Sequence, residues 1–150
     1  MADNIWSVYL SGEIHSDWRD RIRQGAEEAK LPVEFVSPIT DHEASDTVGA
    51  RILGPEADTF WYDHKAAGIN AIRIRNHLEA ADLVVVRFGD KYKQWNAAFE
   101  AGYAAALGTP IITLHGDDLN HALKDIDAAA QAVCETPEQV VQILAYVTQD

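Results

Sequence analysis

The sequence predicts an α/β fold, a doubly wound sandwich with a parallel sheet of five strands. Segments typical of strands and of helices alternate five times along the 150 residues, with no internal repeat and no linker. The most apolar run, residues 82–88, is apolar on both faces. Such a strand belongs in the middle of a parallel sheet that helices cover on both sides. We therefore expect residues 1–150 to form one domain.

The first half of the chain contains two expected strands and one expected helix. Residues 5–10 are rich in strand-forming side chains and end at Ser11-Gly12. Asp17 can cap a helix that runs to about Lys30, and after it residues 33–36 form a short strand. From residue 38 to about 64 no long periodic segment is found. We expect a long loop there, and loops of this length are often functional.

Strands and helices alternate regularly in the second half. Helical spacing covers residues 66–80 and precedes the apolar strand. Residues 97–107 form an alanine-rich helix that Gly108 ends. The remaining elements are a strand at residues 110–114, a short helix at about 119–128, a weak strand at 132–134 and a last helix after Thr136-Pro137. Thr136 and Gln139 have the spacing of a capping box at the start of that last helix.

The expected ligand site lies beyond the carboxyl ends of the strands, at the point where the strand order reverses. In a flavodoxin-like order this point is at the ends of the first and third strands. Its walls are then residues 11–17, the long loop after Ser37 and residues 89–96. Five aromatic side chains fall in these segments: Phe60, Trp61, Tyr62, Tyr92 and Trp95. They suit stacking on a planar base, and core filling or a subunit contact are the alternatives.

Composition excludes several kinds of protein. The formal net charge of -12 opposes binding to nucleic acid polymers and to anionic membranes. The single cysteine, Cys134, excludes an intrachain disulfide and a zinc site made of cysteines. The chain has neither a signal peptide nor an apolar run long enough to span a membrane, so we expect a cytoplasmic protein. Dinucleotide and P-loop motifs are absent, and no cofactor is expected.

Glu100 is the first candidate for chemistry. Small or apolar residues surround it on the helix after the third strand, which places it on an inward face. A buried carboxylate costs several kcal/mol unless it is paired or functional. The alternative, a solvent-facing Glu100 that complements the helix N-terminus, is equally compatible with the spacing.

A second set of candidates is rich in histidine and acids. It comprises Asp41, His42, Glu43, Asp46, Asp63 and His64, with His15 and Asp17 near the first strand. Such groups can share acid–base work or bind a divalent metal when they converge. Their spacing matches no standard metal motif, so a metal site is the lesser alternative and none is predicted.

Four segments carry a resemblance to a known family. The strings YLSGEI at residues 9–14 and FEAGYAAALGTP at residues 99–110 resemble the nucleoside 2-deoxyribosyltransferase-like superfamily. With SPITDHE at residues 37–43 and RFGDKYKQWN at residues 87–96, the whole chain looks like the YtoQ family within it. The resemblance implies a flavodoxin-like fold and cleavage or transfer at the N-glycosidic bond of a nucleoside or nucleotide.

The resemblance also implies roles for individual residues. Glu100 matches the nucleophile that attacks the anomeric carbon and forms a glycosyl-enzyme intermediate, as in a retaining glycosidase. Tyr9 and Gly12 match residues that shape the sugar pocket. The other residues expected to contact substrate lie in the neighbouring segments: Ser11, His15, Gly89, Trp95, Asn96 and Tyr103.

The sequence departs from the superfamily at several positions. Ile74 stands where an Asp usually handles protonation of the leaving base. Gln94 replaces another Asp, Asn96-Ala97 replaces a pair of small residues, and His15 stands where phosphate-preferring members carry Arg. The nucleophile position is kept and the acid position is not, so the acid is expected from Asp41, His42, Asp63 or His64, unless this branch has another activity.

The leading functional interpretation is therefore an enzyme that acts on a nucleoside or nucleoside monophosphate through Glu100. A non-catalytic module that binds a nucleotide-like ligand is the alternative, and a metal-dependent hydrolase built on the four acid candidates is a weaker one. We also expect a homodimer or higher homo-oligomer, because aromatic side chains in exposed segments often mark interfaces. Superfamily members commonly assemble with active sites near subunit contacts, which points the same way.

Overall fold

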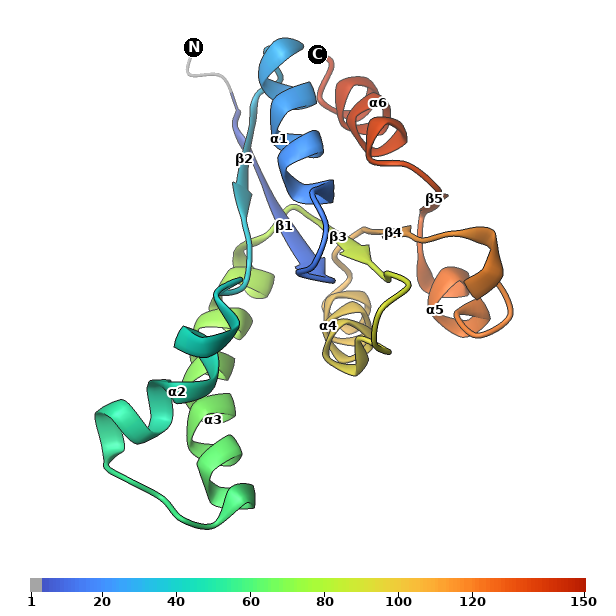
Figure 1. The fold of residues 1–150 in the computed structure, drawn as a ribbon. Coiled ribbons are helices and arrows are strands. Elements are labelled where there is room, and N and C mark those ends of the chain that lie inside the picture. The colour runs from blue at the N-terminus through green and yellow to red at the C-terminus, as the bar shows by residue number, and fades with distance from the viewer. Residues whose placement is uncertain (1–3) are drawn as a thin grey trace.

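The computed structural model describes residues 4–150, which form a five-stranded, all-parallel sheet with helices on both faces (Figure 1). The strands are β1 (Trp6–Gly12), β2 (Val33–Val36), β3 (Leu83–Arg87), β4 (Ile111–Leu114) and β5 (Ala132–Cys134). Their order in the sheet is β2-β1-β3-β4-β5. This is the flavodoxin-like order, and it confirms the predicted fold class.

β3 occupies the centre of the sheet, as its apolar sequence predicted. Val84 to Val86 have no exposed surface, and β3 pairs with β1 on one side and with β4 on the other. The register with β1 places Val8 opposite Leu83 and Gly12 opposite Arg87. The Ser7 N–H donates to the carboxylate of Asp82 at 2.8 Å, which fixes the start of this pairing.

Two helices cover one face of the sheet and three cover the other (Figure 1). On the first face, α1 (Trp18–Glu28) and α6 (Pro137–Val147) contribute Trp18, Ile22, Val140 and Leu144 to the core. On the second face, the end of α3 (Thr59–Ala80) packs beside α4 (Trp95–Ala106) and α5 (Lys124–Ala129). Small residues of α4 (Ala97, Ala101 and Ala104) let this helix approach the sheet closely.

The long loop predicted for residues 38–64 is wrong, because most of it is helical. Helix α2 covers His42–Leu53, and α3 begins at Thr59. The Asp41 carboxylate accepts the Ala44 N–H at 3.1 Å and caps α2, while Asp58 caps α3 through the Trp61 N–H. Gly49 is the single buried residue of α2. A helix that buries so little has no apolar stripe for periodicity to detect.

α2 and α3 pack against each other as a helical hairpin, and its far end extends away from the sheet (Figure 1). The two backbones meet at Gly49, where a Cβ atom would lie 2.5 Å from the Ala66 nitrogen. The Asn70 side chain donates to the Ser45 carbonyl and hydroxyl oxygens, both at 3.1 Å. We refer to residues 42–80 as the α2–α3 hairpin.

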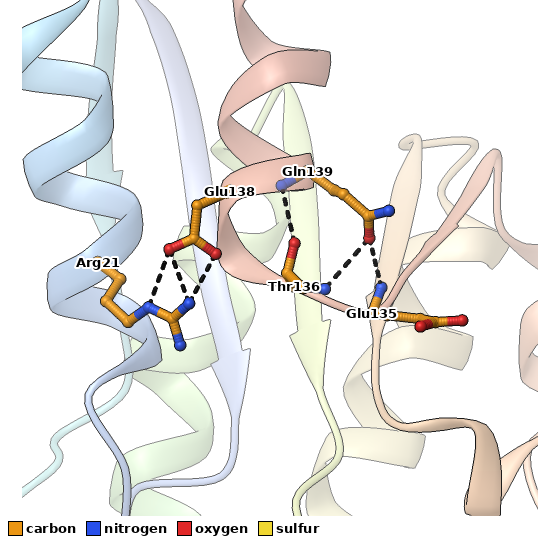
Figure 2. A network of polar contacts seen from close by, with 5 residues as sticks. All are labelled: Arg21, Glu135, Thr136, Glu138 and Gln139. Atoms are coloured by element: carbon orange, nitrogen blue, oxygen red, sulfur yellow. Dashed lines mark hydrogen bonds and ion pairs between the residues drawn. The ribbon is translucent and has the colours of Figure 1, made fainter.

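The start of α6 is fixed by the predicted capping box (Figure 2). The Gln139 N–H donates to the Thr136 hydroxyl, and the Gln139 side-chain oxygen accepts the Thr136 N–H at 3.2 Å. Beside this cap, Glu138 accepts hydrogen bonds from the Arg21 guanidinium of α1, the shortest at 2.6 Å. These contacts join the last helix to the first.

Other helix ends differ from the predictions in detail. Asp17 precedes α1, but its side chain makes no capping hydrogen bond. α5 is shorter than predicted, and a 3₁₀ turn at Asp117–Leu119 precedes it. Gly108 follows the C-cap residue of α4, Leu107, and has φ +79°, as predicted for the residue that ends this helix. Among residues 4–150, no helix is both long enough and apolar enough to cross a lipid bilayer.

Candidate active site

A cavity of about 1000 Å³ lies between the α2–α3 hairpin and the carboxyl ends of β1 and β3. One wall is formed by α2 and α3, and the opposite wall by the β1–α1 loop, the loop before α4 and the first turns of α4. The ligand site predicted from the sequence lies at this same end of the sheet, beyond the carboxyl ends of the first and third strands. The volume is large enough for a nucleoside or nucleotide.

Glu100 lies at the inner end of this cavity, on the second turn of α4. Only 6% of its surface is exposed, so of the two orientations that the spacing allowed, the inward one is present. Its Oε1 accepts the Tyr9 hydroxyl at 3.2 Å, and its Oε2 accepts the Ser11 hydroxyl. Tyr9 and Ser11 are two positions apart on β1, so both side chains leave the same face of the sheet and meet α4.

The environment of Glu100 shifts its proton affinity in both directions. Burial raises the pKa of the Glu100 carboxyl above 4.5, while the hydrogen bonds from Ser11 and Tyr9 and the charge of Arg19 lower it. Burial also raises the pKa of Tyr9, and the neighbouring Glu100 adds to this rise. Tyr9 is therefore a neutral hydrogen-bond donor to the carboxylate.

The β1–α1 loop is held by a buried arginine. Arg19 donates to the main-chain oxygens of Leu10, Gly12 and Glu13, at 2.7–3.2 Å. Burial lowers the pKa of Arg19 to about 10. Gly12 has φ +115°, and a Cβ atom there would lie 2.1 Å from the Arg87 carbonyl oxygen. Only glycine fits at this position of the cavity wall.

Aromatic side chains form the rim of the cavity before α4. Tyr92 packs against the ring of His15, with 5.1 Å between their centroids. Trp95 is 77% exposed and lines the cavity together with Asn96 and Phe99. Phe60, Trp61 and Tyr62 are different, because the structure places them on the first turn of α3 and outside the cavity wall. Of the five predicted aromatics, Tyr92 and Trp95 remain available to a ligand.

The four candidate acids separate into two pairs. His42 and Asp63 line the cavity. Asp41 caps α2 instead, and the His64 ring stacks on Phe60 at 5.8 Å, so neither belongs to the cavity wall. Among residues 4–150, no group of three or more histidine, cysteine or acidic side chains is placed to hold a metal ion.

The predicted substrate-binding residues are also divided. Four of them line the cavity: Gly12, His15, Trp95 and Asn96. Tyr9 and Ser11 are not part of its wall, but both donate hydrogen bonds to Glu100, which is. Two others lie away from its wall. The Gly89 N–H donates to the Gln94 side chain at 3.1 Å, and the Tyr103 hydroxyl donates to Glu79 at 2.7 Å.

Some cavity residues were not among the candidates that the sequence singled out. They are Glu13, Ser45, Asn70 and Phe99. Ser45 and Asn70 lie on the α2–α3 hairpin, and because α2 was not predicted, the residues of α2 that share a face were not recognised. Residues four apart on a helix lie on the same side, so the helix start signal at Asp41 would have placed His42 beside Asp46.

A sequence model of the family described as nucleoside 2-deoxyribosyltransferase YtoQ matches residues 9–148. The uncharacterized protein YtoQ of Bacillus subtilis (strain 168) is 41% identical over 140 residues, which cover 93% of this chain and 95% of that protein.

Similar solved structures share the fold at low sequence identity. A 2-deoxyribosyltransferase from Bacillus psychrosaccharolyticus, described as a biocatalyst for nucleoside synthesis, superposes with a TM-score of 0.55 at 18% identity and 90% coverage of both chains. A conserved protein from Enterococcus faecalis V583 superposes with a TM-score of 0.59 at 17% identity, covering 96% of this chain and 99% of that one. These similarities support the fold assignment alone.

Proposed function

Because the chain belongs to the nucleoside 2-deoxyribosyltransferase YtoQ family, we propose that it cleaves or transfers at the N-glycosidic bond of a nucleoside or nucleoside monophosphate. The carboxylate of Glu100 carries this proposal. It is the one carboxylate of the cavity wall that two buried hydroxyl groups of β1, from Tyr9 and Ser11, hold in place.

The arrangement suits nucleophilic attack by Glu100. A carboxylate oxygen bonds to the anomeric carbon, the C–N bond breaks, and the base leaves with a proton from a general acid of the protein. Transfer is completed when an incoming base displaces Glu100, and hydrolysis when water does so. The hydroxyl groups of Tyr9 and Ser11 orient the carboxylate and stabilise its charged form before the attack.

The aromatic rim of the cavity is suited to a substrate that has a planar base. Tyr92 and Trp95 present aromatic surface at the cavity mouth, where a base can stack. The proposed substrates are nucleosides and nucleoside monophosphates of the cytoplasm. We accordingly propose that the protein itself is cytoplasmic. Whether transfer or hydrolysis dominates depends on the acceptor that enters after the first base has left.

The test is release of free base. Purified protein is incubated with a panel of nucleosides and nucleoside monophosphates, with and without a second base, and the products are separated by chromatography. We expect Glu100→Gln to lower base release by about 1000-fold or more. Glu79→Gln is the matched control, because Glu79 bonds Tyr103 outside the cavity wall, and it should retain activity. No release from any substrate, or equal rates for wild type and Glu100→Gln, would contradict the proposal.

A non-catalytic binding module is the second candidate, and Ile74 favours it. This side chain lines the cavity at the position where the superfamily usually has an acid. A binder would be stabilised against heat by a nucleotide that stays intact, because a ligand of the native state raises the free energy of unfolding. Thermal shift followed by chromatography of the recovered ligand distinguishes the two functions.

A further inference from the structure

The proposed reaction needs a proton donor, and the cavity contains a histidine–carboxylate pair that the reaction as described above does not use. The His42 Nδ1 lies 2.9 Å from Asp46 Oδ2, with the two residues one turn apart on α2. Both line the cavity that contains Glu100, on the wall formed by the α2–α3 hairpin. The pair therefore faces the cavity from the wall opposite α4.

The contact with Asp46 fixes how the His42 ring can act. A carboxylate at Nδ1 holds the proton on that nitrogen and sets the ring orientation. The His42 side chain is 71% exposed, and its contact with Asp46 is made by Nδ1, which leaves the other ring nitrogen, Nε2, unused by this pair. It is thus free to give a proton to a ligand and to take one back. A histidine oriented by a carboxylate is a common general acid–base arrangement in enzymes.

Other polar groups of the cavity are less suited to this task. The Glu13 carboxylate is occupied by the His15 N–H and by the Ser16 hydroxyl at 2.6 Å. His15 itself packs against Tyr92 at the rim. Asp63 lines the cavity from α3 and is the remaining competitor, so the experiment below includes it.

We propose that His42, positioned by Asp46, is the general acid and base of the reaction, an inference that rests on the proposed function. As Glu100 bonds to the anomeric carbon and the C–N bond breaks, Nε2 gives its proton to the leaving base. In the second half, Nε2 takes a proton from the incoming base or water while the bond to Glu100 breaks. The histidine ends each cycle as it began, and no further reactant is needed.

The first experiment measures kcat and KM for base release from a nucleoside that wild type cleaves. We expect His42→Gln to lower kcat by about 100-fold or more. His64→Gln is the matched control, since His64 lies in the same hairpin but outside the cavity wall, and it should be within twofold of wild type. His42 is exposed, so its replacement leaves folding intact, which circular dichroism checks.

A second substrate isolates proton donation. The substrate is a deoxyriboside whose leaving group is p-nitrophenolate. This stable anion can leave without receiving a proton from the protein. With this substrate, we expect the His42→Gln variant to form the glycosyl-enzyme at a rate close to that of wild type. The Glu100→Gln variant should stay inactive. An equal loss on both substrates would show that His42 has a different role and would overturn the inference.

The role of Asp46 is tested by comparing kcat with KM, because Asp46 acts on the substrate through the orientation of His42. Asp46→Asn should lower kcat while KM stays close to that of wild type, Asp46→Glu should partly restore kcat, and Asp46→Asn should lower kcat little further in the His42→Gln variant. Glu43→Gln, on the same helix, is the control. The other charged or titratable groups on the cavity wall stay unchanged in the Asp46 and Glu43 variants: Glu13, His15, Asp63, Arg75, Tyr92, Lys93 and Glu100.

The outcomes separate the two proposals. Base release that requires Glu100 but not His42 contradicts this inference and leaves the proposed function standing. Release lost in Asp63→Asn and kept in His42→Gln assigns the acid to Asp63 and likewise overturns it. Absence of release by wild type contradicts the proposed function, and the inference with it.

Discussion

The carboxylate of Glu100 loses most of its contact with water when the chain folds, and two hydroxyl groups replace only part of that hydration. Its folded pKa is consequently raised above 4.5, with burial as the largest cause. For a carboxyl shifted in this direction, the associated stability is fully present below the unfolded pKa. It is lost as the pH rises through the folded pKa. At neutral pH Glu100 therefore lowers the stability of the fold.

We expect Glu100→Gln to increase the free energy of unfolding at pH 7. Glutamine stays neutral, and its amide oxygen and amino group can still bond the hydroxyls of Ser11 and Tyr9. The gain over wild type should shrink as the pH falls and disappear below about 4.5, the usual carboxyl range. Urea denaturation of both proteins from pH 4 to 8 measures it. A variant less stable than wild type at pH 7 would contradict the prediction.

The residues around Glu100 were only partly predictable from sequence. Its inward face could be inferred from the alanines beside it, but two orientations were compatible with that pattern. The choice between them depends on Tyr9 and Ser11, which are 91 and 89 positions away along the chain. No local pattern encodes such a contact. The role proposed for Glu100 came from the resemblance to a family, while the pairing of His42 with Asp46 depends on α2, a helix that was not predicted.

α1, α4 and α6 each bury several residues and were predicted nearly to their ends, whereas α2 was missed and α3 begins at Thr59, before its predicted start at residue 66. The strand at residues 33–36 and the strand at 132–134 have the predicted bounds, and α4 and α6 begin within two residues of theirs. α2 is held by the Asp41 cap and by the close approach of Gly49 to Ala66. Neither contact produces a periodic pattern of apolar residues. Because the helix predictions relied on that pattern, α2 was not detected.

The capping box of α6 leads to a prediction about this element. Thr136→Ala removes the hydroxyl that caps the helix N-terminus and should lower the free energy of unfolding by about 1 kcal/mol. Arg21→Ala breaks the ion pair with Glu138, whose two side chains are largely exposed, and should cost less. Urea denaturation of the two variants and the double variant measures both effects. A larger loss for Arg21→Ala would contradict this ranking.

At the scale of the whole molecule, apolar surface remains uncovered in one copy of the chain. Phe60 and Trp61 are exposed on the α2–α3 hairpin, and Tyr92, Trp95 and Phe99 are exposed at the cavity rim. Exposed groups of this kind mark interfaces. The net charge of -12 opposes association, but salt screens it beyond about 8 Å at physiological ionic strength.

We therefore expect a homodimer or a higher homo-oligomer. Light scattering at micromolar concentration should give a mass of at least twice the 16.6 kDa of one chain. Replacing Trp61 with glutamate should lower that mass if the hairpin end forms the contact, whereas a Tyr146→Glu variant on α6 serves as the control. A mass near 16.6 kDa for the wild-type protein would contradict the expectation.

The pairing of β1 with β3 also has a consequence for how the protein is made. The Ser7 N–H meets Asp82, 75 positions later in the chain, so one edge of β1 has no partner until β3 has been synthesised. At about 5–20 residues per second, a ribosome takes roughly 4–15 s to reach that point. Unpaired strand edges are templates for aggregation. A nascent chain released before residue 83 would thus expose the inner edge of β1, and we expect such fragments to aggregate rather than to form a smaller folded unit.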